Sequence, residues 1–285
     1  MKLVFMGTPG FTLPVLDALA GEHEIVAVYT QPPRPAGHGM KIRKSPVHEW
    51  GENHQIPVLT PETLKDLNVQ KQLADFNAEA IIVYAYSQMI PDAVLNIAPM
   101  GCINIHPSLL PRWRGAAPII RTIEHGDQQA GVSIMQLDSG WDTGPVLAQE
   151  KIDLNGTETS ESLGKDLTEI AIRLLLDVLK NKPTPVVQSD EGVCYAPKLK
   201  KEELQLDLTL SANDLERKIR AFGKCFIMVG NKRLYITQAE VAQNSDSDCL
   251  KCGQETALRP LRLYYEGQKP VNLHDFLLGN KLPKV

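Results

Sequence analysis

One apolar stretch at residues 80–85, AIIVYA, constrains the fold of this chain more than any other feature. Polar and apolar side chains do not alternate in it, and such runs are typical of strands buried on both faces of a parallel sheet. Residues 2–6 and 24–30 indicate two further strands, and the helical stretch between them predicts a crossover that makes the pair parallel. The sequence therefore predicts an α/β protein with a Rossmann-like, mostly parallel sheet and helices on both faces.

Composition argues against several other classes of protein. The chain has 285 residues, 43% of them hydrophobic and 22% charged, and no apolar run is as long as a membrane span. MKLVFMG leads directly into a strand without a signal segment, so we expect a cytoplasmic protein with no membrane partner. Five scattered cysteines do not suggest a disulfide framework, and Cys249 and Cys252 form a CxxC without a second pair, so we expect no metal. The turn at residues 7–10, GTPG, lacks GxGxxG and does not support NAD binding.

Polar residues with catalytic chemistry follow the central strands. In the strand predicted at 102–106, Ile103 and Ile105 alternate with Asn104 and His106, which places the amide and the imidazole on one face. A second strand, at 132–137, leads into the turn DSGWDTG, which has two carboxylates and can carry an acid to the imidazole. Each residue alone is more often structural, and an Asp in a glycine turn usually only forms the turn. Their combination favours a site at the strand ends, where open α/β sheets bind ligands.

These stretches resemble the folate-dependent formyltransferases, and in particular those that act on tRNA. The shared motifs are FMGTP at 5–9, TQPPRPAGHG at 30–39, SLLPRWRGAAP at 108–118 and DxGxDTG at 138–144, and the resemblance covers most of residues 1–225 and again 261–279. It implies transfer of formyl from 10-formyltetrahydrofolate, as co-substrate, to the amino group of methionyl-tRNA. By position it implies that Asn104, His106 and Asp142 are catalytic.

The resemblance also assigns residues to the folate site. The SLLP run contacts folate in the family, and the backbone of the loop after strand 80–85 receives the pterin ring. Together with a carboxylate of the glycine turn, the residues implied are Ser108, Leu109, Leu110, Pro111, Gln88, Met89, Ile90 and Asp138.

A basic loop at residues 31–48 suggests where an anionic substrate binds. No acidic residue occurs between positions 31 and 48. The loop has four cations and a histidine that stands between two glycines, and these five residues are Arg34, His38, Lys41, Arg43 and Lys44. A solvated basic loop would look the same. The resemblance favours contact with the tRNA acceptor stem, although the family usually has Arg where His38 stands.

The sequence of the C-terminal part predicts a second domain. From residue 226 the chain reads as short strands, and residues 205–285 carry twelve Lys and Arg against nine Asp and Glu, a balance of +3 within a chain of net charge −4. The resemblance implies a small OB-like β-barrel that is shortened here by about one hairpin. We expect a catalytic domain at 1–190, a linker at 191–204, the barrel-like domain at 205–285, and a monomer.

The catalytic residues suffice for formyl transfer without a side-chain nucleophile. Asn104 can donate to the developing oxyanion, His106 can move a proton, and Asp142 can hold the imidazole. Two alternatives stay open at this point. One is formylation of a small amine, such as an amino sugar nucleotide, and the other is a tRNA- or folate-binding protein without turnover.

Overall fold

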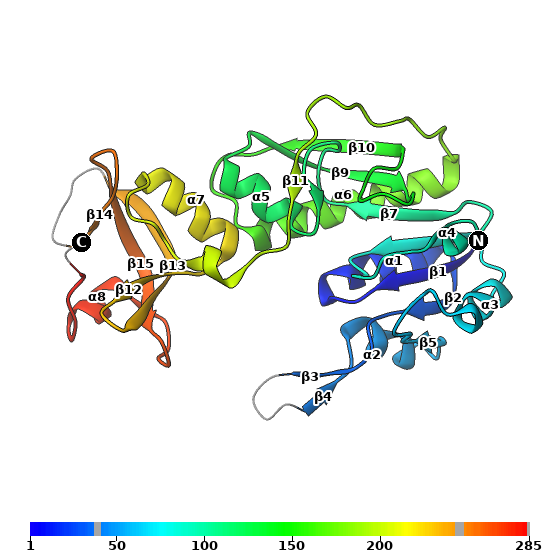
Figure 1. Cartoon of the computed structure of the whole chain (residues 1–285), viewed down its shortest axis with the longest axis horizontal. Helices are drawn as coiled ribbons and strands as arrows, with labels where there is room; N and C mark the ends of the chain where they lie inside the picture. Colours follow the sequence, from blue (N-terminus) through cyan, green and yellow to red (C-terminus); the bar gives the residue numbers. More distant parts are fainter. Residues whose placement is uncertain (37–40, 243–247, 284–285) are drawn as a thin grey trace. The chain divides into compact units, whose positions relative to one another are not determined.

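A seven-stranded sheet in the order β10-β9-β7-β6-β1-β2-β5 forms the centre of the N-terminal part (Figure 1). The computed structural model describes residues 1–36, 41–242 and 248–283. The strands of this sheet are β1 (Lys2–Gly7), β2 (Glu24–Tyr29), β5 (Val58–Leu59), β6 (Ala80–Tyr84), β7 (Cys102–His106), β9 (Gln129–Gln136) and β10 (Val146–Asp153). The first five strands pair in parallel, and β9 pairs antiparallel to β7. The apolar stretch at 80–84 is thus central and parallel, as predicted.

Side chains are buried on both faces of the sheet. Val4 and Met6 of β1 lie in one core cluster with Leu73 and Val94, which come from helices on that face, while the alternate residue Phe5 is fully buried on the other face. Burial on both faces explains the unbroken apolar runs in the sequence. The helices of this part of the chain are α1 (Leu13–Glu22), α2 (Pro46–Asn53), α3 (Leu67–Asp75), α4 (Asp92–Leu95), α5 (Pro118–His125) and α6 (Ser160–Asn181), with a short 3-10 helix η1 (Gly10–Thr12) before α1.

Two small ribbons lie outside the large sheet. β3 (Arg34–Ala36) pairs antiparallel with β4 (Lys41–Arg43), and β8 (Arg114–Gly115) pairs with β11 (Tyr195–Ala196). The first ribbon forms the basic loop, and the second joins the loop after β7 to the connector that follows α6.

The C-terminal module is an antiparallel sheet with helix α7 (Ala212–Phe222) packed against it. Its strands are β12 (Cys225–Val229), β13 (Lys232–Ala242), β14 (Leu250–Lys251), β15 (Ala257–Tyr265) and β16 (Val271–Asn272), and the short helices η2 (Lys201–Leu204) and α8 (Leu273–Leu277) complete it. Ser211 caps α7 by accepting a hydrogen bond from the Asp214 N–H. Leu215 and Ile219 of α7 lie in one core cluster with Leu234 of β13.

The chain divides into two compact units. One contains Met1–Arg114, Gly131–Lys151 and Lys165–Tyr195, and the other contains Gly115–Ala130, Ile152–Gly164 and Ala196–Val285. Helix α5 belongs to the second unit because Arg121 pairs with Glu203 at 2.7 Å and its guanidinium lies over the Phe222 ring of α7. The domain limits at 190 and 204 stay a prediction. None of the described helices is long and apolar enough to cross a membrane.

Candidate active site

The end of β7 presents two buried polar side chains on one face of the strand. Asn104 is 8% exposed and His106 is 4% exposed, and they lie in register with Met135 and Ser133 of β9. Polar side chains at such depth are held by hydrogen bonds or serve a function, because desolvation without a partner is costly. The structure thus places the amide and the imidazole side by side, as the strand alternation predicted.

Hydrogen bonding determines which nitrogen of His106 is available for chemistry. The Nε2 atom lies 2.8 Å from the backbone oxygen of Trp113, and Nδ1 lies 3.7 Å from Oδ2 of Asp142. A carbonyl oxygen only accepts, so Nε2 carries the hydrogen and Nδ1 of the neutral ring has the lone pair. A proton taken up at Nδ1 would therefore face the Asp142 carboxylate. Trp113, with φ +63°, is in the left-handed region in the loop that directs this oxygen toward the ring.

The turn that carries Asp142 is a tightly constrained loop. Asp142 has φ +53°, and a β-carbon at Gly144 would lie 1.9 Å from the backbone oxygen of Gln136, so only glycine fits there without a shift. Asp138 accepts hydrogen bonds from the Gly140 N–H at 3.0 Å and from Thr143 Oγ1 at 2.8 Å. The Asp138 carboxylate therefore organises the turn, and its predicted contact with folate stays a prediction.

The SLLP segment is hydrogen-bonded to side chains of β9 and β10, the two strands next to β7 at the edge of the sheet. Ser133 of β9 donates to the Ser108 carbonyl at 2.6 Å and accepts from the Leu110 N–H at 3.1 Å. Gln149 of β10 donates to Ser133 Oγ at 2.7 Å and to the Leu110 carbonyl at 3.0 Å. Ser108 and Leu110 are buried, whereas Leu109 and Pro111 are partly exposed. The Leu110–Pro111 peptide bond is cis.

The loop after β6 has an exposed tip on a buried base. Met89 is 64% exposed while its neighbour Ile90 is buried, and Gln88 donates to the Pro61 carbonyl at 2.9 Å. Ser87, with φ +64°, lies in the left-handed region. At the base, Tyr86 is buried, which raises the pKa of its hydroxyl, and its carbonyl accepts from Gln31 at 3.0 Å.

The basic loop forms a ribbon in which two arginines face each other. Arg34 of β3 and Arg43 of β4 are direct cross-strand partners, so their side chains leave the same face. Lys44 instead pairs with Glu52 of α2 at 2.6 Å, and this hydrogen bond holds the pKa of the Glu52 carboxyl below its usual range. Lys41 contributes its backbone to β4, and His38 lies outside the described residues.

Sequence reasoning did not identify three residues that support the site. Gln188 and Cys194 lie in the connector after α6, and Arg114 follows the SLLP loop. The thiol of Cys194 accepts from the Trp113 N–H at 3.3 Å, and Arg114 hydrogen-bonds Gln188. Gln188 could have been noticed in the sequence only as a polar residue in a proline-containing connector. Nothing in its neighbourhood along the chain distinguishes it from a solvated side chain.

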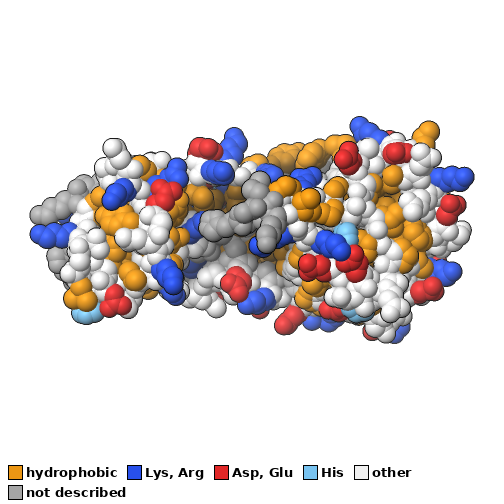
Figure 2. All heavy atoms as spheres, turned by 90° about the horizontal axis from the view of Figure 1, so that it is seen from below, with side chains coloured by type: hydrophobic (Ala, Val, Ile, Leu, Met, Phe, Trp, Pro, Cys, Tyr) orange, Lys and Arg blue, Asp and Glu red, His pale blue; other side chains and the backbone are white. Residues whose placement is uncertain are grey.

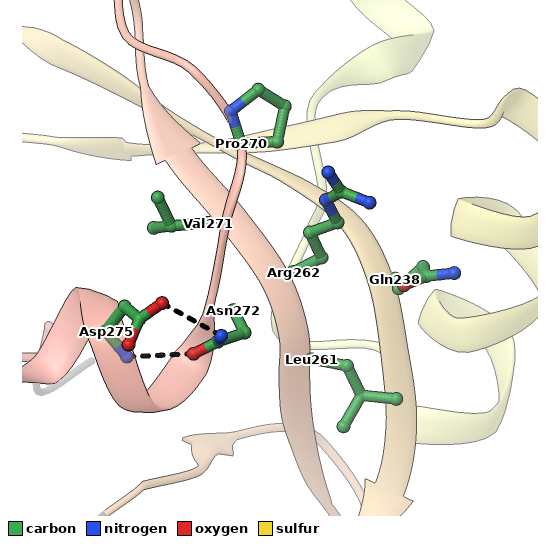
Figure 3. A pocket seen from close by; sticks show the side chains of 7 residues that line it. All are labelled: Gln238, Leu261, Arg262, Pro270, Val271, Asn272 and Asp275. Atoms are coloured by element: carbon green, nitrogen blue, oxygen red, sulfur yellow. Dashed lines mark hydrogen bonds between the residues drawn. The ribbon is translucent and has the colours of Figure 1, made fainter.

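The C-terminal module has a shallow hollow of about 410 Å³ (Figure 3). Its lining residues are Gln238, Leu261, Arg262, Pro270, Val271, Asn272 and Asp275. The Asn272 side chain caps α8 by accepting from the Asp275 N–H at 2.9 Å, and it donates to the Asp275 carboxylate at 2.9 Å. None of the residues placed in the catalytic set lines this hollow.

Comparison with known protein families identifies both modules. Residues 1–179 match the model of a formyl transferase, and residues 198–281 match that of a formyl transferase C-terminal domain. The chain belongs to the formyltransferase family. A methionyl-tRNA formyltransferase from Jannaschia sp. (strain CCS1) is 42% identical over 295 residues, covering 99% of this chain and 98% of the relative. One from Gluconobacter oxydans is 43% identical and covers 100% and 98%.

Solved formyltransferases share the fold at lower sequence identity. A methionyl-tRNA formyltransferase from Clostridium thermocellum superposes with a TM-score of 0.61 at 18% identity, covering 86% of this chain and 95% of that structure. An N-formyltransferase from Helicobacter canadensis, in complex with folinic acid and dTDP-3-aminofucose, gives a TM-score of 0.67 at 15% identity and covers 91% and 98%. The predicted Rossmann-like sheet with a second, C-terminal β domain is thereby confirmed as a formyltransferase fold. The described strands of that domain form an antiparallel sheet, and the shortened OB-like barrel expected there stays a prediction.

Proposed function

We propose that this formyltransferase transfers the formyl group of 10-formyltetrahydrofolate to the amino group of methionyl-tRNA. The observation that carries the proposal is the buried pair Asn104 and His106 with Asp142 at 3.7 Å from the imidazole. These are the groups that acyl transfer to an amine requires, and they stand in a chain whose full-length relatives are methionyl-tRNA formyltransferases. Since this reaction prepares initiator tRNA for translation, we place the enzyme in the cytoplasm. We also expect the enzyme to act as a monomer.

The chain's own groups divide the work as follows. The folate supplies an activated formyl group, and the acceptor amine itself is the nucleophile. Asn104 donates an amide hydrogen to the formyl oxygen as negative charge develops there, which is commonly the largest catalytic contribution. His106 accepts the proton of the attacking amine at Nδ1 and returns it toward the leaving nitrogen. Asp142 lies 3.7 Å from Nδ1, where its carboxylate keeps the ring in place.

The residues suited to hold folate lie in two segments, one after β6 and one after β7. The loop at Gln88, Met89 and Ile90 combines an exposed thioether with a buried base, as a site for a flat, partly polar ring requires. The SLLP segment is fixed by Ser133 and Gln149 and offers a second rigid wall. We assign the first to the pterin and the second to the neighbouring part of the co-substrate.

The ribbon β3–β4 is suited to the acceptor stem. Two like charges directly opposite in a ribbon destabilise it, so the pairing of Arg34 with Arg43 is tolerated best when an anion lies between the guanidinium groups. Phosphate is such an anion, and Arg binds it with two parallel hydrogen bonds. On the face drawn in Figure 2, Lys and Arg side chains are interspersed with Asp and Glu, so a local cluster contributes more to tRNA binding than general charge attraction.

A formylation assay tests this proposal. The protein is incubated with 10-formyltetrahydrofolate and either methionyl-tRNA or free amino sugar nucleotides, and the formylated product is identified. We expect formylmethionyl-tRNA, with a rate that falls steeply with added salt because bound phosphates release counterions. Formylation of the sugar nucleotide alone would favour the small-amine alternative, and turnover of neither acceptor would favour a binding protein.

Charge removal on the ribbon separates acceptor from folate binding. The double variant Arg34→Gln with Arg43→Gln should raise KM for tRNA about tenfold or more and leave KM for folate unchanged. The matched control removes two exposed cations elsewhere, Lys65→Gln with Lys71→Gln, and should change neither constant. Equal KM values for tRNA in both double variants would remove the ribbon from the acceptor site.

A further inference from the structure

The side chain of Gln188 links the glycine turn that carries Asp142 to Arg114, which lies in the segment after His106. Its amide nitrogen donates to two carbonyls of the glycine turn, those of Asp142 at 2.8 Å and Gly144 at 2.7 Å. Its amide oxygen accepts from Nε and an η nitrogen of Arg114, at 3.1 Å and 2.8 Å. One side chain thus has four hydrogen bonds, two to the turn of Asp142 and two to the segment that follows the His106 loop.

Arg114 is itself fixed on the side of His106. Its side chain is 8% exposed, and its backbone N–H donates to the Cys194 carbonyl at 3.0 Å. It directly follows Trp113, whose carbonyl accepts from His106 Nε2. The guanidinium therefore connects Gln188 to the same backbone that orients the imidazole.

The contacts at position 188 require a side chain with both a hydrogen-bond donor and a hydrogen-bond acceptor on one planar group. Two carbonyl oxygens on one side need N–H donors, and a guanidinium on the other side needs an acceptor, which is the chemistry of a primary amide. Glutamate would satisfy the guanidinium but would place a negative oxygen against the two carbonyls. An apolar side chain would satisfy neither side.

We propose that Gln188 is a positioning residue for formyl transfer, which sets the distance between the Asp142 carboxylate and His106 by tying the glycine turn to Arg114. This inference rests on the proposed function. Asp142 has φ +53°, a conformation that the surrounding contacts must maintain, and the two hydrogen bonds from Gln188 hold the backbone on both sides of Thr143. Gln188 acts through Asp142 and need not touch either substrate.

Two variants of Gln188 test the role. Gln188→Glu keeps the Arg114 side and loses the turn side, whereas Gln188→Met loses both. We expect kcat for formyl transfer to fall at least tenfold in each, with KM for both substrates within twofold, because displacement of a catalytic group by about 1 Å can cost a hundredfold. Val187→Ala changes the neighbouring side chain, which is 84% exposed, and should leave kcat unchanged.

A double-mutant cycle distinguishes positioning from general stabilisation. If Gln188 acts by placing the Asp142 carboxylate, Gln188→Glu should lower single-turnover rates less than twofold when Asp142→Ala is already present. Two losses that multiply, or an unchanged kcat in both folded Gln188 variants, would overturn the inference. If Gln188→Glu fails to fold, the same double-mutant cycle with Gln188→Met in its place tests the inference by the same two outcomes. A wild-type protein without formyl transfer would overturn the proposed function instead.

Discussion

Ser133→Ala tests whether the SLLP segment depends on strand β9. The Ser133 side chain is fully buried, and its hydroxyl hydrogen-bonds the Ser108 carbonyl and the Leu110 N–H. Alanine fits the space but leaves both backbone groups without this partner, and each buried unsatisfied group costs about 1–3 kcal/mol. Gln149 still donates to the Leu110 carbonyl, so part of the segment stays anchored. We expect the free energy of unfolding to fall by about 2–4 kcal/mol, a large share of the roughly 5–15 kcal/mol typical of a domain.

The loss should affect folate binding more than chemistry. The loosened segment is the one we assign to folate, while Asn104 and His106 keep their places in β7, so KM for folate should rise at least fivefold and kcat should change less than threefold. Urea unfolding and steady-state kinetics measure the two effects, and Ser139→Ala, at an exposed position of the glycine turn, is the control. A Ser133→Ala protein with a free energy of unfolding within 0.5 kcal/mol of wild type, a margin of about the size expected at unconstrained surface sites, would refute the reasoning.

Three further perturbations have defined outcomes. Asn104→Ala and His106→Ala should each lower kcat about a hundredfold or more while circular dichroism stays unchanged, and near wild-type turnover in both would contradict the site assignment. Gly144→Ala should lower kcat strongly because its β-carbon meets a backbone carbonyl of β9, whereas Gly21→Ala in α1 meets no heavy atom within 4 Å, so equal kcat values in the two variants would count against a rigid turn. Burial raises the pKa of Glu203, but hydrogen bonds from the Lys200 backbone and from α5 outweigh it and lower the pKa, so the ionised form stabilises the fold. Glu203→Gln should therefore cost about 1–2 kcal/mol at pH 7, and the difference from wild type should shrink as the pH falls through the lowered pKa; a constant difference would speak against the ion pair.

The sequence predicts those features that local periodicity determines. The apolar run of β6 and the alternation that pairs Asn104 with His106 both depend on neighbours within a few residues, and the structure confirms each. The sequence also locates the glycine turn, because its residue types are specific to turns.

Contacts between distant segments lie beyond this reasoning. Gln188 reaches Asp142 across 46 positions, and Ser133 reaches Ser108 across 25, and no repeat or motif signals either contact. For Lys44, sequence reasoning fails in another way, because it assigns to substrate binding a cation that the fold pairs within the protein. It reads as a free cation of a basic loop, but the fold brings Glu52 within 2.6 Å of it.

The β8–β11 ribbon has a consequence for recombination between relatives. The first family model ends at residue 179, yet the following segment returns through Cys194 to the Trp113 N–H, and the Ala196 carbonyl accepts from the Ala116 N–H at 2.8 Å. A chimera spliced at residue 179 would take this returning segment from the donor of the C-terminal module and pair it with a foreign catalytic loop. Splicing after Ala196, just before the second family model begins at residue 198, keeps the ribbon from one parent and exchanges the C-terminal module alone.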